Sequence, residues 1–327
     1  MTKPVFSKDL IKINDVQATI NHIVERLKND VTRVLRRQGA VVGISGGIDS
    51  SVTLALAVKA FGADKVLGVM LPEKDSSGDS KAFALKLANK FGIEVVEENI
   101  SAALDGFACY QRRDEAVKRV IPSYNPDSDK MKIVIPEEFI NSNLPPVFYL
   151  TVIFADGREQ SERLPMAEYL QIVAASNFKQ RSRMTMLYYH AEARHYAVIG
   201  TPNKHEVQQG FFVKYGDGGA DVMPIGDLYK TQVYELAHAL GVPREIIERT
   251  PTTDTYSAEQ TQEEFFYQMP FEAMDLLWYA WENGYQPEEV ASVMGKERLD
   301  IERIFRNFER KKRTTDYLRR PPIHNYN

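Results

Sequence analysis

The chain has 327 residues, of which 43% are apolar and 26% charged, and its formal net charge at pH 7 is -4. This balance is typical of a globular protein with a full core, and it gives no general reason to expect binding to nucleic acid or to an anionic membrane. The single cysteine, Cys109, excludes an internal disulfide and a cysteine-cluster metal site, and no apolar run approaches membrane-spanning length. We therefore expect a cytoplasmic protein.

The N-terminal third of the chain alternates between helical and extended patterns. Apolar residues recur at helical spacing over 15–37, and the strand "AVVGIS" follows at 40–45. Then come a helix at about 50–61, a buried strand at 65–71, a helix at 80–92 and a third strand at 93–100. A helix at about 180–195 leads to a fourth strand at 197–200. This order predicts an α/β fold, a doubly wound parallel sheet with flanking helices.

Two regions depart from that alternation. Residues 131–157 contain two apolar, β-branched runs separated by "NSNLPP", which predicts a β-hairpin or small subdomain inserted into the α/β pattern. From Pro270 onward the chain is helical. We therefore divide it into a domain at 1–268, with an insertion at about 108–162, and a helical C-terminal extension at 269–327. Its last two helices could be taken for a helix-turn-helix, but such pairs are common and we expect no DNA recognition.

The stretch "SGGIDSS", residues 45–51, lies between a predicted strand and a predicted helix. Gly46 and Gly47 let the backbone approach a ligand closely, and the N–H groups at a helix N-terminus bind anions. Asp49 would repel phosphates unless a divalent cation lay between them, which implies Mg2+. A glycine turn with an Asp or Ser cap is the simpler alternative, but the whole stretch fits one purpose. The spacing matches neither the Walker P-loop nor the dinucleotide fingerprint.

A second glycine-rich stretch, "KYGDGGAD" at 214–221, carries two carboxylates and a cation beside a tight backbone path. Taken alone, it could equally be a structural turn with solvated charges. Lys230 begins a predicted helix, where a cation is unfavourable unless an anion offsets it, so a phosphate partner is expected. Glu206 could join Asp49 as a Mg2+ ligand, although a helical glutamate is more often a surface residue.

These motifs resemble those of a known family. "SGGIDSS" is similar to the pyrophosphate-binding loop of the N-type ATP pyrophosphatases, whose fold is Rossmann-like. "GTPNKHEVQQGFFVKYGDGGADVMPIGDLYKTQV", 200–233, resembles the NAD synthetase signature, and "NFKQRSRM", 177–184, resembles that family's Asn-x-x-x-Arg-x-Arg-Met helix. The motifs have the family's order and rough spacing, and the resemblance runs from about Ile20 to Thr261.

The resemblance implies roles for individual residues. It implies that Asp49 and Glu206 bind Mg2+, and that Asp49, Lys214 and Lys230 are the catalytic residues. It implies a set of ATP-binding residues: Gly43, Ser45, Gly46, Gly47, Asp49, Ser50, Ser51, Thr201, Lys230 and Thr252. It also implies a set that contacts a deamido-NAD-like substrate: Asn177, Arg181, Phe211, Lys214, Asp217 and Asp221, with Lys311 near the substrate phosphates.

The family's reaction has two steps. The nicotinate carboxylate attacks the α-phosphate of ATP, which gives an acyl adenylate and pyrophosphate, and ammonia then displaces AMP to leave the amide. The resemblance also implies a homodimer. The chain is similar to the ammonia-dependent type, so we expect ammonia to be free or delivered by a separate glutaminase.

Some segments differ from the family pattern. Pro202 stands where the family commonly has Gly or Asp, residues 250–270 are polar and then aromatic, and the interval from Ile100 to Asn177 is long. These differences leave two alternatives open: the same adenylation and amidation of a different carboxylic acid, and an inactive regulatory protein that binds adenine nucleotides.

Overall fold

The computed structural model describes the chain outside a few short segments. The described residues are 3–76, 78–135, 147–252, 255–258, 260–262, 266–267 and 269–324. Within them, no helix combines the length and apolar character needed to cross a bilayer.

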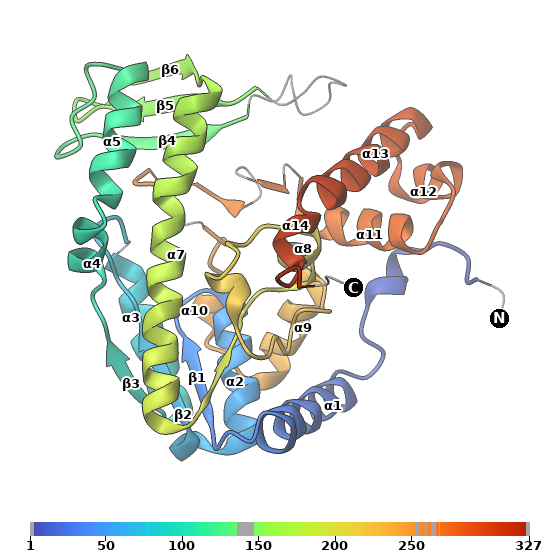
Figure 1. The fold of residues 1–327 in the computed structure, drawn as a ribbon. Coiled ribbons are helices and arrows are strands. Elements are labelled where there is room, and N and C mark those ends of the chain that lie inside the picture. The colour runs from blue at the N-terminus through green and yellow to red at the C-terminus, as the bar shows by residue number, and fades with distance from the viewer. Residues whose placement is uncertain are drawn as a thin grey trace.

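The predicted parallel sheet is confirmed (Figure 1). It contains β1 (Ala40–Gly43), β2 (Val66–Met70), β3 (Glu94–Glu97) and β7 (Ala197–Ile199), in the order β3-β2-β1-β7. Val41 of β1 pairs with Leu67 on one side and with Val198 on the other. All four strands lie where the sequence predicted them: β1, β2 and β7 are apolar and almost entirely buried, whereas the edge strand β3 has exposed glutamates on either side of Val95 and Val96.

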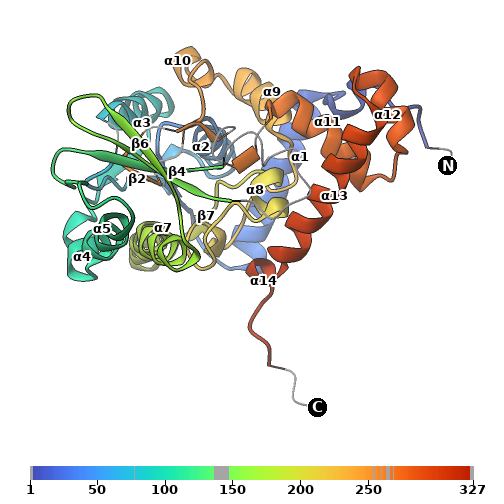
Figure 2. The same cartoon turned by 90° about the horizontal axis from the view of Figure 1, so that it is seen from above.

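Helices cover both faces of this sheet (Figure 2). On one face, Ala40 and Val42 share a core with α1 (Val16–Asn29), α2 (Ile48–Phe61), α3 (Gly78–Phe91) and α9 (Lys230–Leu240). On the other face, Val41 packs with α7 (Met166–Arg194). Successive strand residues thus point to opposite layers, as the two-residue period of a strand requires. The doubly wound α/β prediction is confirmed.

A second, antiparallel sheet lies at one end of α7, with the order β4-β5-β6. Its strands are β4 (Lys130–Val134), β5 (Tyr149–Ile153) and β6 (Glu159–Arg163). The two predicted strands are confirmed, while the "NSNLPP" turn lies outside the described residues. The third strand was not predicted, because β6 is polar and mostly exposed and lacks the apolar alternation that identifies a strand. Apolar side chains of β4 and β5 pack against α5 (Cys109–Val120) and α7.

The predicted helix at about 180–195 was too short. The helix α7 begins at Met166, directly after Pro165 in an extended conformation, and it ends where His195 takes a left-handed φ of 58°. It runs along both sheets and joins them (Figure 1). Shorter helical segments complete this part of the chain: η1 (Lys8–Ile11), η2 (Asp30–Val34), η3 (Ala63–Lys65), α4 (Ser101–Gly106), α8 (Lys204–Gln209), η4 (Asp217–Gly219) and α10 (Arg244–Ile247).

The C-terminal region is helical, as predicted, with α11 (Phe271–Glu282), α12 (Pro287–Met294), α13 (Arg298–Thr314) and α14 (Asp316–Arg319). These helices enclose a core around Trp278 and Phe308. Phe6 and Ile11 from the N-terminus lie in the same core. The first residues of the chain therefore pack with its last helices, and the proposed boundary at residue 268 stays a prediction.

The loop between β1 and α2 is packed tightly against α3. Gly46 has a φ of +73°, which favours glycine. A Cβ at this position would lie 2.6 Å from the Cβ of Phe83 and 2.9 Å from the carbonyl oxygen of Ser80. Glycine is thus required here for two separate reasons, backbone conformation and space.

We predict that Gly46→Ala lowers the free energy of unfolding by about 2–4 kcal/mol, since left-handed strain and overpacking add. Gly92→Ala is the matched control: Gly92 also has a positive φ, +66°, but a Cβ added there would meet no heavy atom within 4 Å. It should lose only about 1 kcal/mol. Urea unfolding of both variants measures the difference, and equal losses would show that α3 does not confine the loop.

Candidate active site

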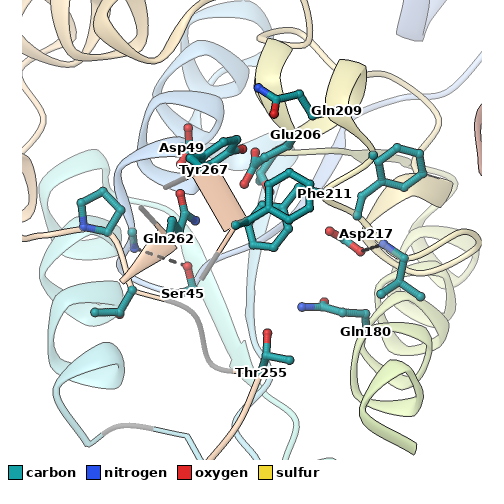
Figure 3. Close-up of a pocket in the computed structure, with 18 of the residues that line it drawn as sticks. Ser45, Asp49, Gln180, Glu206, Gln209, Phe211, Asp217, Thr255, Gln262 and Tyr267 are labelled. Atoms are coloured by element: carbon teal, nitrogen blue, oxygen red, sulfur yellow. Dashed lines mark hydrogen bonds between the residues drawn. The ribbon is translucent and has the colours of Figure 1, made fainter. Parts of the chain in front are cut away.

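A cavity of about 1350 Å³ opens at the carboxyl ends of the parallel strands. Its lining includes Gly43 at the end of β1, Met70 at the end of β2 and Thr201 after β7. Ligands of open α/β sheets bind at this edge. The volume exceeds the roughly 300–1,000 Å³ that is typical of sites for one small molecule, so the cavity has room for more than one such ligand. In Figure 3, Ser45, Asp49, Glu206 and Asp217 face this space.

Hydrogen bonds hold the loop at 45–51 in shape. The Gly47 N–H donates to Ser45 Oγ at 3.3 Å, and the hydroxyls of Ser50 and Ser51 donate to the Gly47 carbonyl at 3.0 and 2.8 Å. Gly47 caps α2, so the N–H groups of the first turn lack partners within the helix and are oriented to bind an anion. Ser45 and Ser50 line the cavity, whereas Ser51 is fully buried. In this structure Ser51 stabilises the loop, and its contact with ATP stays a prediction.

Asp49 forms a buried ion pair with Lys230. The Nζ atom of Lys230 lies 2.5 Å from Oδ2 of Asp49, and the Lys230 side chain is fully buried. Burial favours a lower pKa for Lys230, but the charges of Asp49 and Glu206 outweigh it and raise this pKa above its ordinary value. Lys230 therefore remains an ammonium ion at the N-terminus of α9. The Lys230 side chain does not line the cavity. Its charge acts there through Asp49, which does line it.

Asn203 joins the two predicted metal ligands. Its Nδ2 donates to Oδ1 of Asp49 at 3.1 Å, and its backbone N–H donates to Oε2 of Glu206 at 2.8 Å. The same residue caps α8, with its side chain accepting from the backbone N–H groups of His205 and Glu206. Asn203 was not predicted from the sequence, although "NKHE" at 203–206 has the spacing of a capping box.

The carboxylates of Asp49 and Glu206 fit a Mg2+ site. Burial raises the pKa of Glu206 to about 8, and the charge of Asp49 adds to the effect, so a second cation would stabilise this pair. The described residues contain no group of three or more His, Cys, Asp or Glu that could hold a metal alone. Two carboxylates suffice for Mg2+ when substrate phosphates supply further ligands.

An aromatic and charged group lies farther along the cavity. The rings of Phe211 and Phe266 stack with centroids 4.5 Å apart. Lys311 Nζ lies 4.4 Å from the Phe266 ring centroid and donates to its carbonyl at 2.9 Å, and burial lowers the pKa of Lys311 to about 8. Burial likewise raises the pKa of Asp217 to about 6, and this carboxylate accepts from the Val213 N–H. Phe211, Asp217, Lys311 and Asn177 all line the cavity.

Other predicted site residues do not line the cavity but form hydrogen bonds between the segments around it. Lys214 Nζ donates to the carbonyls of Tyr317 and Arg320, and Arg181 donates to the Lys214 carbonyl. Asp221 accepts from the Val198 N–H and from the Tyr188 hydroxyl. These side chains connect the 214–221 loop to α14, α7 and β7. Direct contact of Lys214, Arg181 and Asp221 with substrate stays a prediction, and Gly46 likewise lies behind the cavity lining. Thr201 and Thr252 line the cavity, and their contact with ATP stays a prediction.

Two walls of the cavity were not predicted. The inserted region contributes apolar side chains, Ile133, Ile135 and Phe148, and Phe148 stacks on Tyr169 of α7 at 4.2 Å. The helix α13 contributes basic ones: Arg303, Arg306, Arg310, Lys311 and Arg313. Only Lys311 had been singled out, although basic residues recur along this helix at the spacing of one face.

A buried charged cluster stabilises the wall after β2. Lys179 Nζ lies 3.0 Å from Oε1 of Glu73 and 2.7 Å from Oδ2 of Asp75, and it donates to the Thr255 carbonyl. Arg113 of α5 also pairs with Asp75. The cluster joins the loop after β2 to α5, α7 and the 255–258 segment. Nothing in the sequence around Lys179 distinguishes it from an ordinary helical lysine.

Comparison with known proteins agrees with this geometry. The family model described as NAD synthase matches residues 19–121 and 149–322. The NH(3)-dependent NAD(+) synthetase of Mesorhizobium japonicum is 48% identical over 309 residues, which cover 94% of this chain and 96% of that protein. The protein of the same name from Rhizobium meliloti is 44% identical over 97% of this chain and 94% of its own length.

Solved structures show the same fold. The NMN synthetase of Francisella tularensis has a TM-score of 0.64 at 23% identity, covering 96% of this chain and all of that one. The NH3-dependent NAD synthetase of Campylobacter jejuni has a TM-score of 0.62 at 20% identity, with coverage of 96% and 100%. With the family model matching most of its length and close relatives matching nearly all of it, this chain belongs to the NAD synthase family.

Proposed function

We propose that this protein is an ATP-dependent ligase that amidates deamido-NAD with ammonia to form NAD, AMP and pyrophosphate. The observation that carries the proposal is the gathering of Asp49, Glu206 and Lys230 beside an anion-binding loop, at the edge of the sheet where the cavity opens. The relatives that share this chain's length are named for the same reaction.

The first step forms the acyl adenylate. A carboxylate oxygen attacks the α-phosphorus of ATP while the bond from that phosphorus to the bridging oxygen breaks, and the electron pair leaves with pyrophosphate. We assign stabilisation of the growing negative charge to the first-turn N–H groups of α2 and to Lys230. Mg2+ held by Asp49 and Glu206 would neutralise the phosphate oxygens.

The second step forms the amide. Ammonia attacks the acyl carbon, the acyl carbon–oxygen bond breaks, and AMP leaves with the electron pair. The nitrogen must then lose a proton. Asp217 faces the cavity and its pKa is about 6, so it is mostly ionised at neutral pH, and we assign proton uptake to it. The apolar wall at Ile133, Ile135 and Phe148 would limit hydrolysis of the adenylate by keeping water out.

Ammonia is proposed to enter free or from a separate glutaminase, and the cytoplasm stays the predicted compartment. The free thiol of Cys109 is consistent with a reducing compartment. Its hydrogen bond to the Ala175 carbonyl and a pKa raised to about 11 by burial make it a structural group.

We predict that purified protein with ATP, Mg2+, ammonium and deamido-NAD releases NAD, AMP and pyrophosphate in equal amounts. Chelation of Mg2+ should stop the reaction, and glutamine should not replace ammonium. Lys230→Met should lower kcat by about a hundred-fold or more, because the buried cation that pairs with Asp49 beside the anion-binding loop is lost. Lys59→Met, an exposed lysine on α2, is the matched control. Chromatography measures NAD, AMP and pyrophosphate under each condition and for each variant.

The same assay separates the alternatives. If AMP forms only with another acid, such as nicotinate mononucleotide, that acid replaces deamido-NAD as the substrate. ATP binding with no pyrophosphate release across a panel of acids would indicate a regulatory protein and overturn the proposal.

We predict a pH dependence of deamido-NAD binding that arises from Lys311. Its ammonium form binds anions, and because its pKa is lowered to about 8 this form is lost as pH rises through that value. The KM for deamido-NAD should therefore increase between about pH 7 and pH 9 in the wild type. Lys311→Arg stays charged and should show a flat profile, while Lys311→Met should bind weakly throughout. Lys312→Met is the neighbouring control; identical wild-type and Lys311→Arg profiles would remove Lys311 from the site.

We further propose a homodimer that uses the exposed side of α7. Large apolar side chains are exposed near both ends of this helix: Met166 (62% exposed) and Leu170 (57%) lie about one turn apart near its start, and Tyr189 (60%) lies near its end. We predict that light scattering of the wild type gives twice the chain mass and that Tyr189→Glu gives a monomer. Leu299→Glu, at a position 62% exposed on α13, should stay dimeric. A monomeric wild type would contradict the proposal.

A further inference from the structure

Asp275 is a fully buried carboxylate on α11 that no motif of the sequence indicates. Its Oδ1 lies 2.6 Å from Nε2 of His205 on α8. Its Oδ2 accepts from the backbone N–H of Thr231 at 2.8 Å and from the Thr231 hydroxyl at 2.6 Å, at the start of α9. One side chain thus joins three helices through three hydrogen bonds.

Both partners of Asp275 are direct neighbours of active-site residues. His205 precedes Glu206, and Thr231 follows Lys230. Glu206 and Lys230 both act on Asp49, one as a like charge and one as its ion-pair partner. A shift of α8 relative to α9 would therefore change the arrangement of charges around Asp49. The contacts of Asp275 therefore hold α8 and α9 in place directly beside Glu206 and Lys230.

The hydrogen-bond pattern also fixes the orientation of His205. Gln209 Nε2 lies 3.2 Å from Nδ1 of His205 and Asp275 Oδ1 lies 2.6 Å from its Nε2, so both ring nitrogens have a polar partner. The rings of Trp278 and Tyr267 lie near the imidazole, at 5.9 and 6.0 Å between centroids. Hydrogen bonds in such dry surroundings are strong and directional. In addition, a carboxylate at the N-terminus of α9 offsets the unfavourable position of the Lys230 cation.

We infer that Asp275 is a positioning residue that sets the geometry of Glu206 and Lys230 about Asp49, and through them the affinity for the ATP–metal complex. The inference rests on the proposed function for the identity of that ligand. It makes the C-terminal helices part of the catalytic unit, since α11 supplies the link.

The test uses the full-length protein and Mn2+ with ATP as the probe, followed by the paramagnetic resonance signal of free Mn2+. Asp275→Ala should weaken Mn2+–ATP binding by about ten- to a hundred-fold, the range typical when a supporting partner of a metal ligand is lost. Asp275→Asn keeps an acceptor for Thr231 and should fall between this variant and the wild type. The KM for ATP should rise in the same order, and high Mg2+ should partly restore activity.

Two further variants keep the test decisive. Tyr285→Phe removes a hydrogen bond from the hydroxyl of Tyr285, just after α11, to the Pro4 carbonyl, far from the site, and should leave Mn2+–ATP binding unchanged. If Asp275→Ala does not fold, Thr231→Val removes only the hydroxyl bond and should weaken binding less than Asp275→Asn does. Folded Asp275 variants with wild-type Mn2+–ATP affinity would overturn the inference. The probe needs no acid or ammonia, so a wild type that binds Mn2+–ATP but makes no NAD would contradict only the proposed function.

Discussion

The ion pair between Lys230 and Asp49 is the interaction on which the rest of the site depends. It joins the first turns of α2 and α9, and its ammonium group is fully buried. A lysine is stable in that position only with a negative partner, since burial and the helix N-terminus both disfavour its charge. Removing either partner leaves an uncompensated buried charge, which costs about 3–5 kcal/mol. The pair therefore fixes the anion-binding loop and α9 in one arrangement.

The charges of that pair are not balanced on their own, because the carboxylate of Glu206 also interacts with the Lys230 ammonium ion. Asp49 raises the pKa of Glu206, and Asn203 holds both carboxylates in place through its amide and its backbone N–H. Two carboxylates and one ammonium leave one negative charge at the cavity surface when both acids are ionised. A bound divalent cation would change the net charge at the cavity surface from negative to positive, and this charge would attract phosphate oxygens. The charge pattern thus explains why a loop suited to anions contains an aspartate.

Much of the fold could be predicted from the sequence because local patterns determine it. Three of the four parallel strands, β1, β2 and β7, are apolar runs, and Gly46 and Gly47 occur where the backbone turns into α2. The strand β6 could not be predicted, because its exposed residues carry no apolar period. The links made by Asp275 and Lys179 also could not, since each depends on partners tens of residues away in the chain. Asn203 could have been found from its capping-box spacing, so in that case the signal was present and was missed.

The cavity walls differ in chemistry, and the difference matches the two tasks of an adenylating ligase. The helix α13 presents basic side chains, which suit the phosphate groups of two nucleotides. The opposite wall, at Ile133, Ile135 and Phe148, is apolar and lies in the interval at 122–148 that the family model does not match. Under the proposed function, charge stabilisation would depend on residues within the family match, whereas exclusion of water would depend partly on a segment outside it. Substitutions at Ile133 or Phe148 would then alter the fraction of adenylate lost to water more than the rate of its formation.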